Sequence, residues 1–349
     1  MLHPADKAVL RLTVGLGLAA MIAYGLALPL PFLCCLMAVI LLTKPGPPLP
    51  LVKGLVVAIL LAGLVALDVC MVPPLENYPM SGDLLTSVIL FALFFLGLRT
   101  GNPLTQVLVI TFTLIPVAGV AEQALVTMIA TTLAVGLLIG VVVSGMTQAL
   151  FPDPPGLASR PAPPPVLAPV SAAWIALRGM LVVMPVFVLA LTNPSLYLAA
   201  IMNTVTLSQQ ACSADTRSAG RQLVGSTVMA AAMALLVWLG LSLLPNLWML
   251  MLWLMAAALW AGVGIYRIRV TRFPPAFWSS ALTTMLILLG PAIGDSANGK
   301  GVVGTSLGRI ALFVGVALYA WAMVWILERW RASRGQASSY HQSVTGGTA

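Results

Sequence analysis

The chain has 349 residues, of which 60% are hydrophobic and only 7% are charged, and its mean hydropathy is +1.04. Soluble domains carry about 25% charged residues. A soluble core at this length could not bury so much apolar sequence, so the excess must face lipid. The composition excludes an ordinary soluble domain and predicts an all-α, polytopic membrane protein.

The net charge of +8 does not indicate a nucleic-acid partner, because the basic residues lie between apolar stretches. Their placement is typical of charge bias across a membrane. The cysteines, Cys34, Cys35, Cys70 and Cys212, fall in or beside apolar stretches and form no CxxC pair. They are interpreted as small buried side chains rather than a disulfide or metal framework, and no metal or cofactor is predicted.

Apolar segments follow one another along the chain from the first residues. Lys7 and Arg11 before an apolar run resemble a signal peptide, but similar spans follow, so a retained first helix is expected. A spanning helix needs about 20 mostly apolar residues. Twelve spans are predicted: 8–28, 31–43, 54–73, 84–98, 104–119, 124–149, 172–192, 196–212, 222–244, 246–266, 276–293 and 305–327.

The basic residues fix the expected orientation of these spans. With the N-terminus in the cytoplasm, fifteen of the 17 Lys and Arg residues fall on the cytoplasmic side, and only Lys300 and Arg309 fall outside. This is a positive-inside distribution. The sequence therefore predicts a multi-pass protein with both termini in the cytoplasm.

A triplet of basic residues occurs twice at the ends of apolar stretches. The two sets are Arg11, Lys53 and Arg99, and then Arg178, Arg221 and Arg267. Their spacings are 42 and 46 residues in the first set and 43 and 46 in the second. We expect two copies of one six-helix unit, 1–150 and 171–332, separated by a Pro-rich cytoplasmic linker, 151–170, and followed by a disordered cytoplasmic tail, 333–349. Because each unit has an even number of spans, this 6+6 repeat is parallel.

Two short patterns suggest enzymes, and both are rejected. Gly304–Gly308 matches GxSxG, but the histidines of the chain, His3 and His341, lie in its tails. The segment 294–301 is one residue short of a P-loop and lacks its Ser/Thr. No catalytic residue is assigned, and no enzyme is expected. The GxxxG patterns at 97–101 and 136–140 indicate close helix packing.

The spans 31–43 and 196–212 are short and follow prolines at corresponding places. Such spans point to a transporter's binding site, although a thin packing element is an alternative. Asn203, Thr206 and Gln210 share one face of the later span, where they would bind substrate or join helices. Asp68 is a candidate for ion coupling, and an interfacial or capping role is its alternative.

The chain resembles the fusaric acid resistance and aromatic acid exporter (FUSC-like) superfamily. The resemblance lies in the paired six-helix units, the opening ADKAVLRLTVGLGLAAMIAYGLALPLPFL, and the segments VKGLVVAILLAG and GRQLVGSTVMAA, which begin at or beside Lys53 and Arg221. Many members carry a large soluble domain after each membrane unit, and here a short linker and tail stand instead.

The resemblance implies a bacterial inner-membrane efflux component for small, often aromatic, carboxylic acids that works with a periplasmic membrane-fusion adaptor protein. Lys53, Arg99, Arg221 and Arg267 would contact the anionic substrate. The alternative from the residues alone is that these cations only set topology. A passive anion channel and a non-transporting scaffold for an adaptor complex are the rival functions, and a homo-oligomer is left open.

Overall fold

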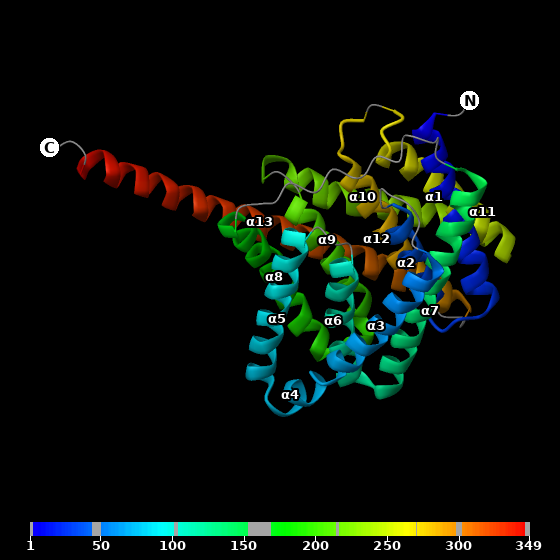
Figure 1. Ribbon diagram of the computed structural model, residues 1–349, viewed down its shortest axis with the longest axis horizontal. Coiled ribbons are helices and arrows are strands. Elements are labelled where there is room, and N and C mark those ends of the chain that lie inside the picture. Colours follow the sequence, from blue (N-terminus) through cyan, green and yellow to red (C-terminus); the bar gives the residue numbers. More distant parts are fainter. Residues whose placement is uncertain are drawn as a thin grey trace.

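A computed structural model describes residues 3–43, 50–100, 104–152, 169–213, 216–269, 271–297 and 302–345 (Figure 1). Within these ranges the regular structure is helical, with no strand. Some side chains inside the helices, that of Arg221 among them, lie outside the description. The linker predicted at 151–170 falls mostly on residues outside the described ranges.

The first part of the chain forms α1 (Pro4–Gly25), α2 (Pro31–Leu42), α3 (Leu51–Val69), α4 (Val72–Asn77), α5 (Pro79–Thr100), α6 (Leu104–Ala121) and α7 (Gln123–Leu150). The second part forms α8 (Pro169–Thr192), α9 (Pro194–Ser213), α10 (Thr216–Leu243), α11 (Leu247–Ile265), α12 (Pro275–Ala297) and α13 (Val302–Thr345). The Gly304–Gly308 pattern lies inside α13. α13 also continues through residues 333–345, where the sequence predicts a disordered tail.

Within the described ranges, nine helices are long and apolar enough to cross a membrane. The shorter apolar helices are α2 and the Val107–Ala121 part of α6. Each predicted span overlaps one of the long helices or one of these shorter ones, except that 196–212 overlaps α9, which is less apolar. These helices fit an all-α, multi-pass membrane protein.

Prolines stand at the first position of several helices, including α2, α5, α9 and α12. A proline is tolerated there because its missing N–H would have no partner within the helix. α1 begins with a capping box, in which the Ala5 N–H donates to His3 Nδ1 at 3.3 Å and the His3 N–H donates to Asp6 Oδ2 at 3.2 Å. These local signals set where the helices begin.

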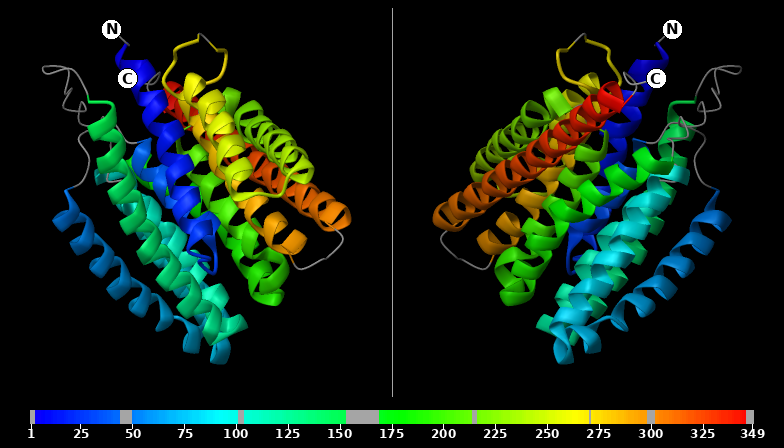
Figure 2. Two further views of the ribbon diagram at one scale, coloured as in Figure 1. Left: turned by 90° about the vertical axis from the view of Figure 1, so that its right-hand side faces the viewer. Right: turned by 90° about the vertical axis from the view of Figure 1, so that its left-hand side faces the viewer.

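The beginning of α1 and the end of α13 lie toward the same end of the bundle (Figure 2). The segment after α11, which contains Arg267, lies at that end as well, and α4 lies at the opposite end. The Lys7 Nζ donates to the Pro152 carbonyl at 2.8 Å and so joins the beginning of α1 to the end of α7. We call this the basic end of the bundle.

Helices pack in the same pattern in both parts of the chain. α1 packs on α2 and α7, α2 packs on α7, and α3 packs on α6 and α7. In the second part α8 packs on α9 and α13, α9 packs on α13, and α10 packs on α12 and α13. The two parts meet where α1 packs on α11, α5 on α8, α2 on α12 and α6 on α9. α2 is almost wholly buried at the centre of this arrangement.

Close packing at the 136–140 glycine pattern is confirmed. A Cβ added at Gly136 would lie 2.9 Å from the Cys34 Cα, and one at Gly140 would lie 3.3 Å from the Ala38 Cα. Both neighbours belong to the backbone of α2. The two glycines therefore let α7 approach α2, and this contact lies within the chain.

Candidate functional site: a central polar pocket

A pocket of about 210 Å³ lies among α2, α6, α9 and α12. Helices from both parts of the chain contribute to it, and we call it the central pocket. Its described polar lining consists of Thr43, Thr206, Gln209, Gln210, Ser279, Ser280 and Thr283. Its apolar lining consists of Leu36, Val39, Ile40, Ile110 and Ala276. Polar side chains gathered at this depth of an apolar bundle need a partner, which makes the pocket the candidate functional site.

The two helices that begin at the expected prolines, α2 and α9, supply two walls of the pocket. α2 is short, with 12 residues, but α9 has 20 residues and is longer than the span expected at 196–212. α2 contributes Leu36, Val39 and Ile40 before it ends, and Thr43 at its C-terminal end. α9 contributes Thr206, Gln209 and Gln210 from its second half. The sequence pointed to these two segments, and the structure brings them together at one cavity.

The predicted polar stripe of α9 faces protein. The Asn203 Oδ1 accepts a hydrogen bond from the Thr284 hydroxyl at 3.0 Å. The Gln210 Nε2 donates to the Gln222 carbonyl at 3.2 Å, and its Oε1 accepts from the Ser226 hydroxyl at 3.1 Å. Asn203 thus joins α9 to α12 and Gln210 joins α9 to α10, as the helix-joining alternative predicts, and the role of the stripe in substrate binding stays a prediction. Thr206 and Gln210 line the pocket as well.

Two buried polar atoms near the pocket have no hydrogen-bond partner among the described residues. They are the Ser280 Oγ, on a side chain that is 5% exposed, and the Asn203 Nδ2, on a side chain that is fully buried. Leaving such a group unpaired costs about 1–3 kcal/mol. Because Ser280 lines the cavity, a bound molecule would remove this cost there.

The four predicted basic site residues lie elsewhere or outside the description. Lys53 at the start of α3 and Arg99 at the end of α5 are exposed. Arg267 is exposed after α11 with a φ of 54°. None of these three is among the residues that line the central pocket. The side chain of Arg221 lies outside the described residues, although its chain neighbour Gln222 accepts the hydrogen bond from Gln210.

Asp68, the coupling candidate, is only 5% exposed on α3 and lies beside Thr111 of α6. Its Oδ2 has no hydrogen-bond partner in the described part of the chain. α6 carries Ile110 into the central pocket, so the helix next to Asp68 also borders the cavity. The carboxyl group itself does not line the pocket.

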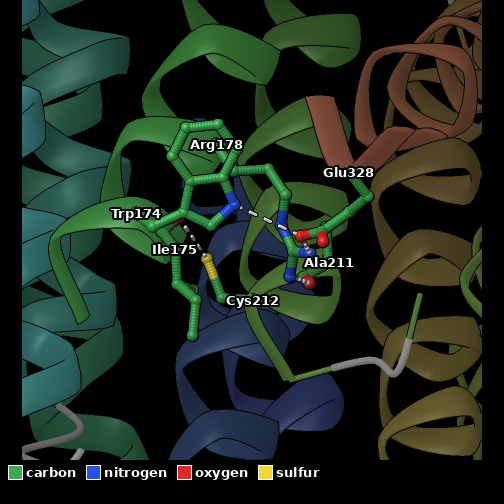
Figure 3. A network of polar contacts seen from close by, with 6 residues as sticks. All are labelled: Trp174, Ile175, Arg178, Ala211, Cys212 and Glu328. Atoms are coloured by element: carbon green, nitrogen blue, oxygen red, sulfur yellow. Dashed lines mark hydrogen bonds and ion pairs between the residues drawn. The ribbon is translucent and has the colours of Figure 1, made fainter. Parts of the chain in front are cut away.

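Arg178 of the second basic triplet forms a buried network rather than part of the pocket (Figure 3). Its Nη1 lies 2.9 Å from Glu328 Oε1 of α13, and its Nη2 donates to the Ala211 carbonyl of α9. The Trp174 Nε1 donates to the same carboxyl oxygen at 3.4 Å. The network joins α8, α9 and α13 and leaves Arg178 4% exposed.

Arg11 of the first triplet makes a parallel contact. Its Nη1 donates to the Gln148 Oε1, which joins α1 to α7. Arg11 and Arg178 thus connect the first helix of each predicted unit to its last helix.

Ser279, Ser280 and Thr283 of α12 were not predicted from the sequence, and Thr43 and Gln209, although polar residues of predicted spans, were not among the predicted site residues. The signal for α12 was present as the run SSALTT at 279–284, whose polar residues recur at helical spacing inside an apolar span. Only the packing of α12 against α2 and α9 shows that this run meets the stripe of α9.

A second cavity of about 710 Å³ lies near the other end of the bundle. It is formed where α1 and α10 end and α11 begins, with Tyr24, Trp238, Asn246 and Leu247 in its lining. Its lining is more apolar than that of the central pocket and includes no charged side chain among the described residues. Its polar lining residues are Tyr24 of the first part and Ser242 and Asn246 of the second part.

Fold and site define the class as an all-α, multi-pass membrane protein with a polar cavity inside its bundle. A family model with the description "Protein of unknown function (DUF2955)" matches residues 8–147, less than half of the chain. No curated protein and no solved structure matches the chain.

Proposed function

We propose that the chain is an efflux permease of the bacterial inner membrane for small organic anions, with aromatic carboxylates as the expected class. The substrate binds in the central pocket. The observation that carries the proposal is this pocket itself, a set of hydroxyl and amide groups among α2, α9 and α12 inside an apolar bundle. Transporters place their sites at the interface between repeats, and a short helix such as α2 is typical of such sites.

The packing pattern supports the parallel 6+6 repeat of about twelve spans. If α1 corresponds to α8, α2 to α9, α6 to α12 and α7 to α13, the contacts within one unit have counterparts in the other. The contacts between units correspond too, since α2 packs on α12 and α9 packs on α6. The repeat axis would then pass between α2 and α9, where the central pocket lies. The family match at 8–147 also ends close to the proposed end of the first unit at 150.

The basic end of the bundle supports a cytoplasmic location for both termini. Lys7 lies at the beginning of α1, which is at that end. The segment between α11 and α12, also at that end, contains Arg267, Arg269 and Arg272. Anions in the cytoplasm would be concentrated there by these charges and by Lys53, Arg99 and Arg221. The same residues also satisfy the positive-inside rule.

Short connections at the opposite end support dependence on a periplasmic membrane-fusion adaptor protein. Only Glu122 separates α6 from α7, and only Asn193 separates α8 from α9. Such connections cannot extend across a periplasm. Dependence on an adaptor protein is also what the FUSC-like resemblance implies, and we propose that this resemblance holds for the whole chain.

Uptake into inverted membrane vesicles tests the function. Vesicles that contain the protein should accumulate an aromatic acid such as benzoate, and Arg221→Ala with Arg267→Ala should reduce the rate. Glu122→Ala, which removes an exposed charge from the opposite end of the bundle, is the control. Unchanged uptake in the double variant would refute the contribution of these arginines.

Two further measurements separate the rival functions. Currents in planar bilayers without a proton gradient would indicate a passive anion channel. A deletion strain with unchanged susceptibility to every organic acid tested would favour a scaffold.

A further inference from the structure

The threonine hydroxyls of the central pocket direct their protons away from the cavity. Thr43, Thr206 and Thr283 each donate to the backbone carbonyl four residues earlier in the chain, at 2.7, 3.0 and 3.1 Å. A hydroxyl has one proton and two acceptor lone pairs. These three side chains therefore offer a ligand hydrogen-bond acceptors.

The amide of Gln210 is also committed, because its Nε2 donates to the Gln222 carbonyl and its Oε1 accepts from Ser226. The described lining contains no charged side chain. α2 ends and α12 begins at the cavity, so partial charges of both signs from helix ends reach it. Ser280 is buried and has no partner in the described part of the chain, so its hydroxyl can donate to a ligand as well as accept from it. The other polar residues of the described lining are Ser279 and Gln209.

We propose that the central pocket binds a small carboxylic acid in its uncharged, protonated form, with the acid's O–H donating to the hydroxyl oxygens of the pocket. An ionised carboxylate there would meet the lone pairs of the three threonines without a cation among the described lining residues, which is costly in an apolar interior. The protonated acid can donate to a threonine oxygen and accept from the Ser280 hydroxyl. This inference rests on the proposed function and names the form of the substrate that the pocket selects.

The apolar lining suits the apolar part of such an acid. Leu36, Val39, Ile40 and Ile110 supply apolar surface to the same cavity. The volume of about 210 Å³ corresponds to about seven water molecules at roughly 30 Å³ each. A single ring with one carboxyl group fits this space.

Titration of the protein can be separated from titration of the ligand. The described titratable or charged groups on or against the pocket helices, including the segment between α11 and α12, are Asp6, Lys7, Arg11, Tyr24, Cys34, Cys35, Lys53, Asp68, Glu76, Asp83, Arg99, Arg178, Tyr197, Cys212, Tyr266, Arg267, Arg269, Arg272, Tyr319, Glu328, Arg329 and Arg331. None of these side chains lines the pocket. A ligand of the same shape that does not ionise therefore reports any change in the protein itself.

The test is equilibrium binding to the purified full chain in detergent, measured by calorimetry from pH 5 to pH 8 with benzoic acid and with benzamide. Benzamide keeps N–H donors and stays uncharged. A carboxyl group ionises near pH 4. The apparent Kd of benzoic acid should thus rise about tenfold per pH unit, while that of benzamide stays constant. A constant Kd for benzoic acid, or binding of benzoate without benzamide, would overturn the proposal.

Variants locate the binding. Thr283→Val and Ser280→Ala each remove one hydroxyl and should weaken both ligands about tenfold. Thr113→Val is the matched control, because Thr113 is buried on α6, donates to its own helix at 2.8 Å, and does not line the pocket. Thermal unfolding of each variant checks that it is folded. If Thr283→Val does not fold, Ser280→Ala decides, and unchanged binding in it refutes the location.

The two proposals fail in different ways. Binding with the expected pH dependence but no vesicle uptake would refute the permease function and leave this inference intact. Uptake that follows the concentration of ionised benzoate would refute the inference and leave the permease function intact.

Discussion

At the scale of single residues, Arg178 shows how burial changes the meaning of a charge. By sequence it is one of six similar basic residues at the ends of apolar stretches. In the structure it is almost fully buried and paired with Glu328, with the Ala211 carbonyl as a second acceptor. A buried cation that is paired in this way stabilises helix contacts and is not available to a substrate.

Removing Arg178 should destabilise the protein strongly. Arg178→Ala leaves the Glu328 carboxyl with only the Trp174 N–H donor that the structure shows at 3.4 Å. Breaking a buried ion pair by removing one partner costs about 3–5 kcal/mol. Thermal unfolding of the purified protein in detergent would measure the loss.

The control is the double variant Arg178→Met with Glu328→Met. Apolar residues of similar volume avoid an uncompensated charge, so this variant should recover much of the lost stability. An unfolding midpoint for Arg178→Ala equal to that of the wild type would show that the pair contributes nothing.

The stripe on α9 shows how far residue patterns could predict the site. Asn203, Thr206 and Gln210 follow from helical spacing in an apolar span, because such groups must avoid lipid. Their partners on α10 and α12 could not be predicted, since the sequence does not say which helices pack together. The exposed positions of Lys53 and Arg99 could not be predicted for the same reason.

At the scale of helices, the contact between α7 and α2 depends on residues without side chains. The Cβ positions that Gly136 and Gly140 lack are occupied by Cys34 and Ala38 of α2 and by the side chain of Leu41. α2 has twelve residues and is held mainly by its neighbours. Its place beside the central pocket therefore depends on this contact.

Gly136→Ala should destabilise the protein, and Gly145→Ala on the same helix should not. The new Cβ at 136 would meet α2 backbone at 2.9 Å, and such overpacking costs about 1–3 kcal/mol. No atom lies within 4 Å of the Cβ position at Gly145, where alanine gains up to about 1 kcal/mol of helix propensity. Thermal unfolding should show opposite signs, and equal shifts would contradict the role of the contact.

Tyr266 holds the end of α2. Its hydroxyl donates to the Leu42 carbonyl at 3.2 Å. This hydrogen bond joins the C-terminal end of α11 to the end of α2.

Tyr266→Phe should cost about 1 kcal/mol, the usual net value of one hydrogen bond. Hydrogen exchange of residues 39–43 should become faster, because the α2 end loses a partner. The difference between wild type and variant should be the same at pH 6 and pH 8. Unchanged exchange in this segment would show that other contacts hold the end of α2.

At the scale of the whole molecule, the lengths of the apolar segments predicted where the helices lie but not which helices pack together. Helix positions follow from apolar length alone, so each predicted span falls on a helix. The short α4 was not predicted, because the span 54–73 ends at its beginning and the rest of α4 lies between two predicted spans. The central pocket requires tertiary contacts between α2, α6, α9 and α12, and a hydropathy pattern does not contain them.

The proposed topology places the connections of the bundle on alternate sides of the membrane. Glu122 and Asn246 are exposed and lie in connections of the end opposite to the basic end. Pro152 and Arg269 are exposed and belong to the basic end. With the basic end in the cytoplasm, only the first pair is accessible from outside the cell.

Cysteine labelling tests this arrangement in a variant that lacks Cys34, Cys35, Cys70 and Cys212. A single cysteine at 122 or 246 should react with a membrane-impermeant maleimide in intact cells. A cysteine at 152 or 269 should react only after the cells are permeabilised. Labelling with the sides reversed would overturn the orientation. Labelling of 122 and 152 from the same side would show that α7, which separates them, does not cross the membrane, and the repeat of six spans per unit would then be wrong.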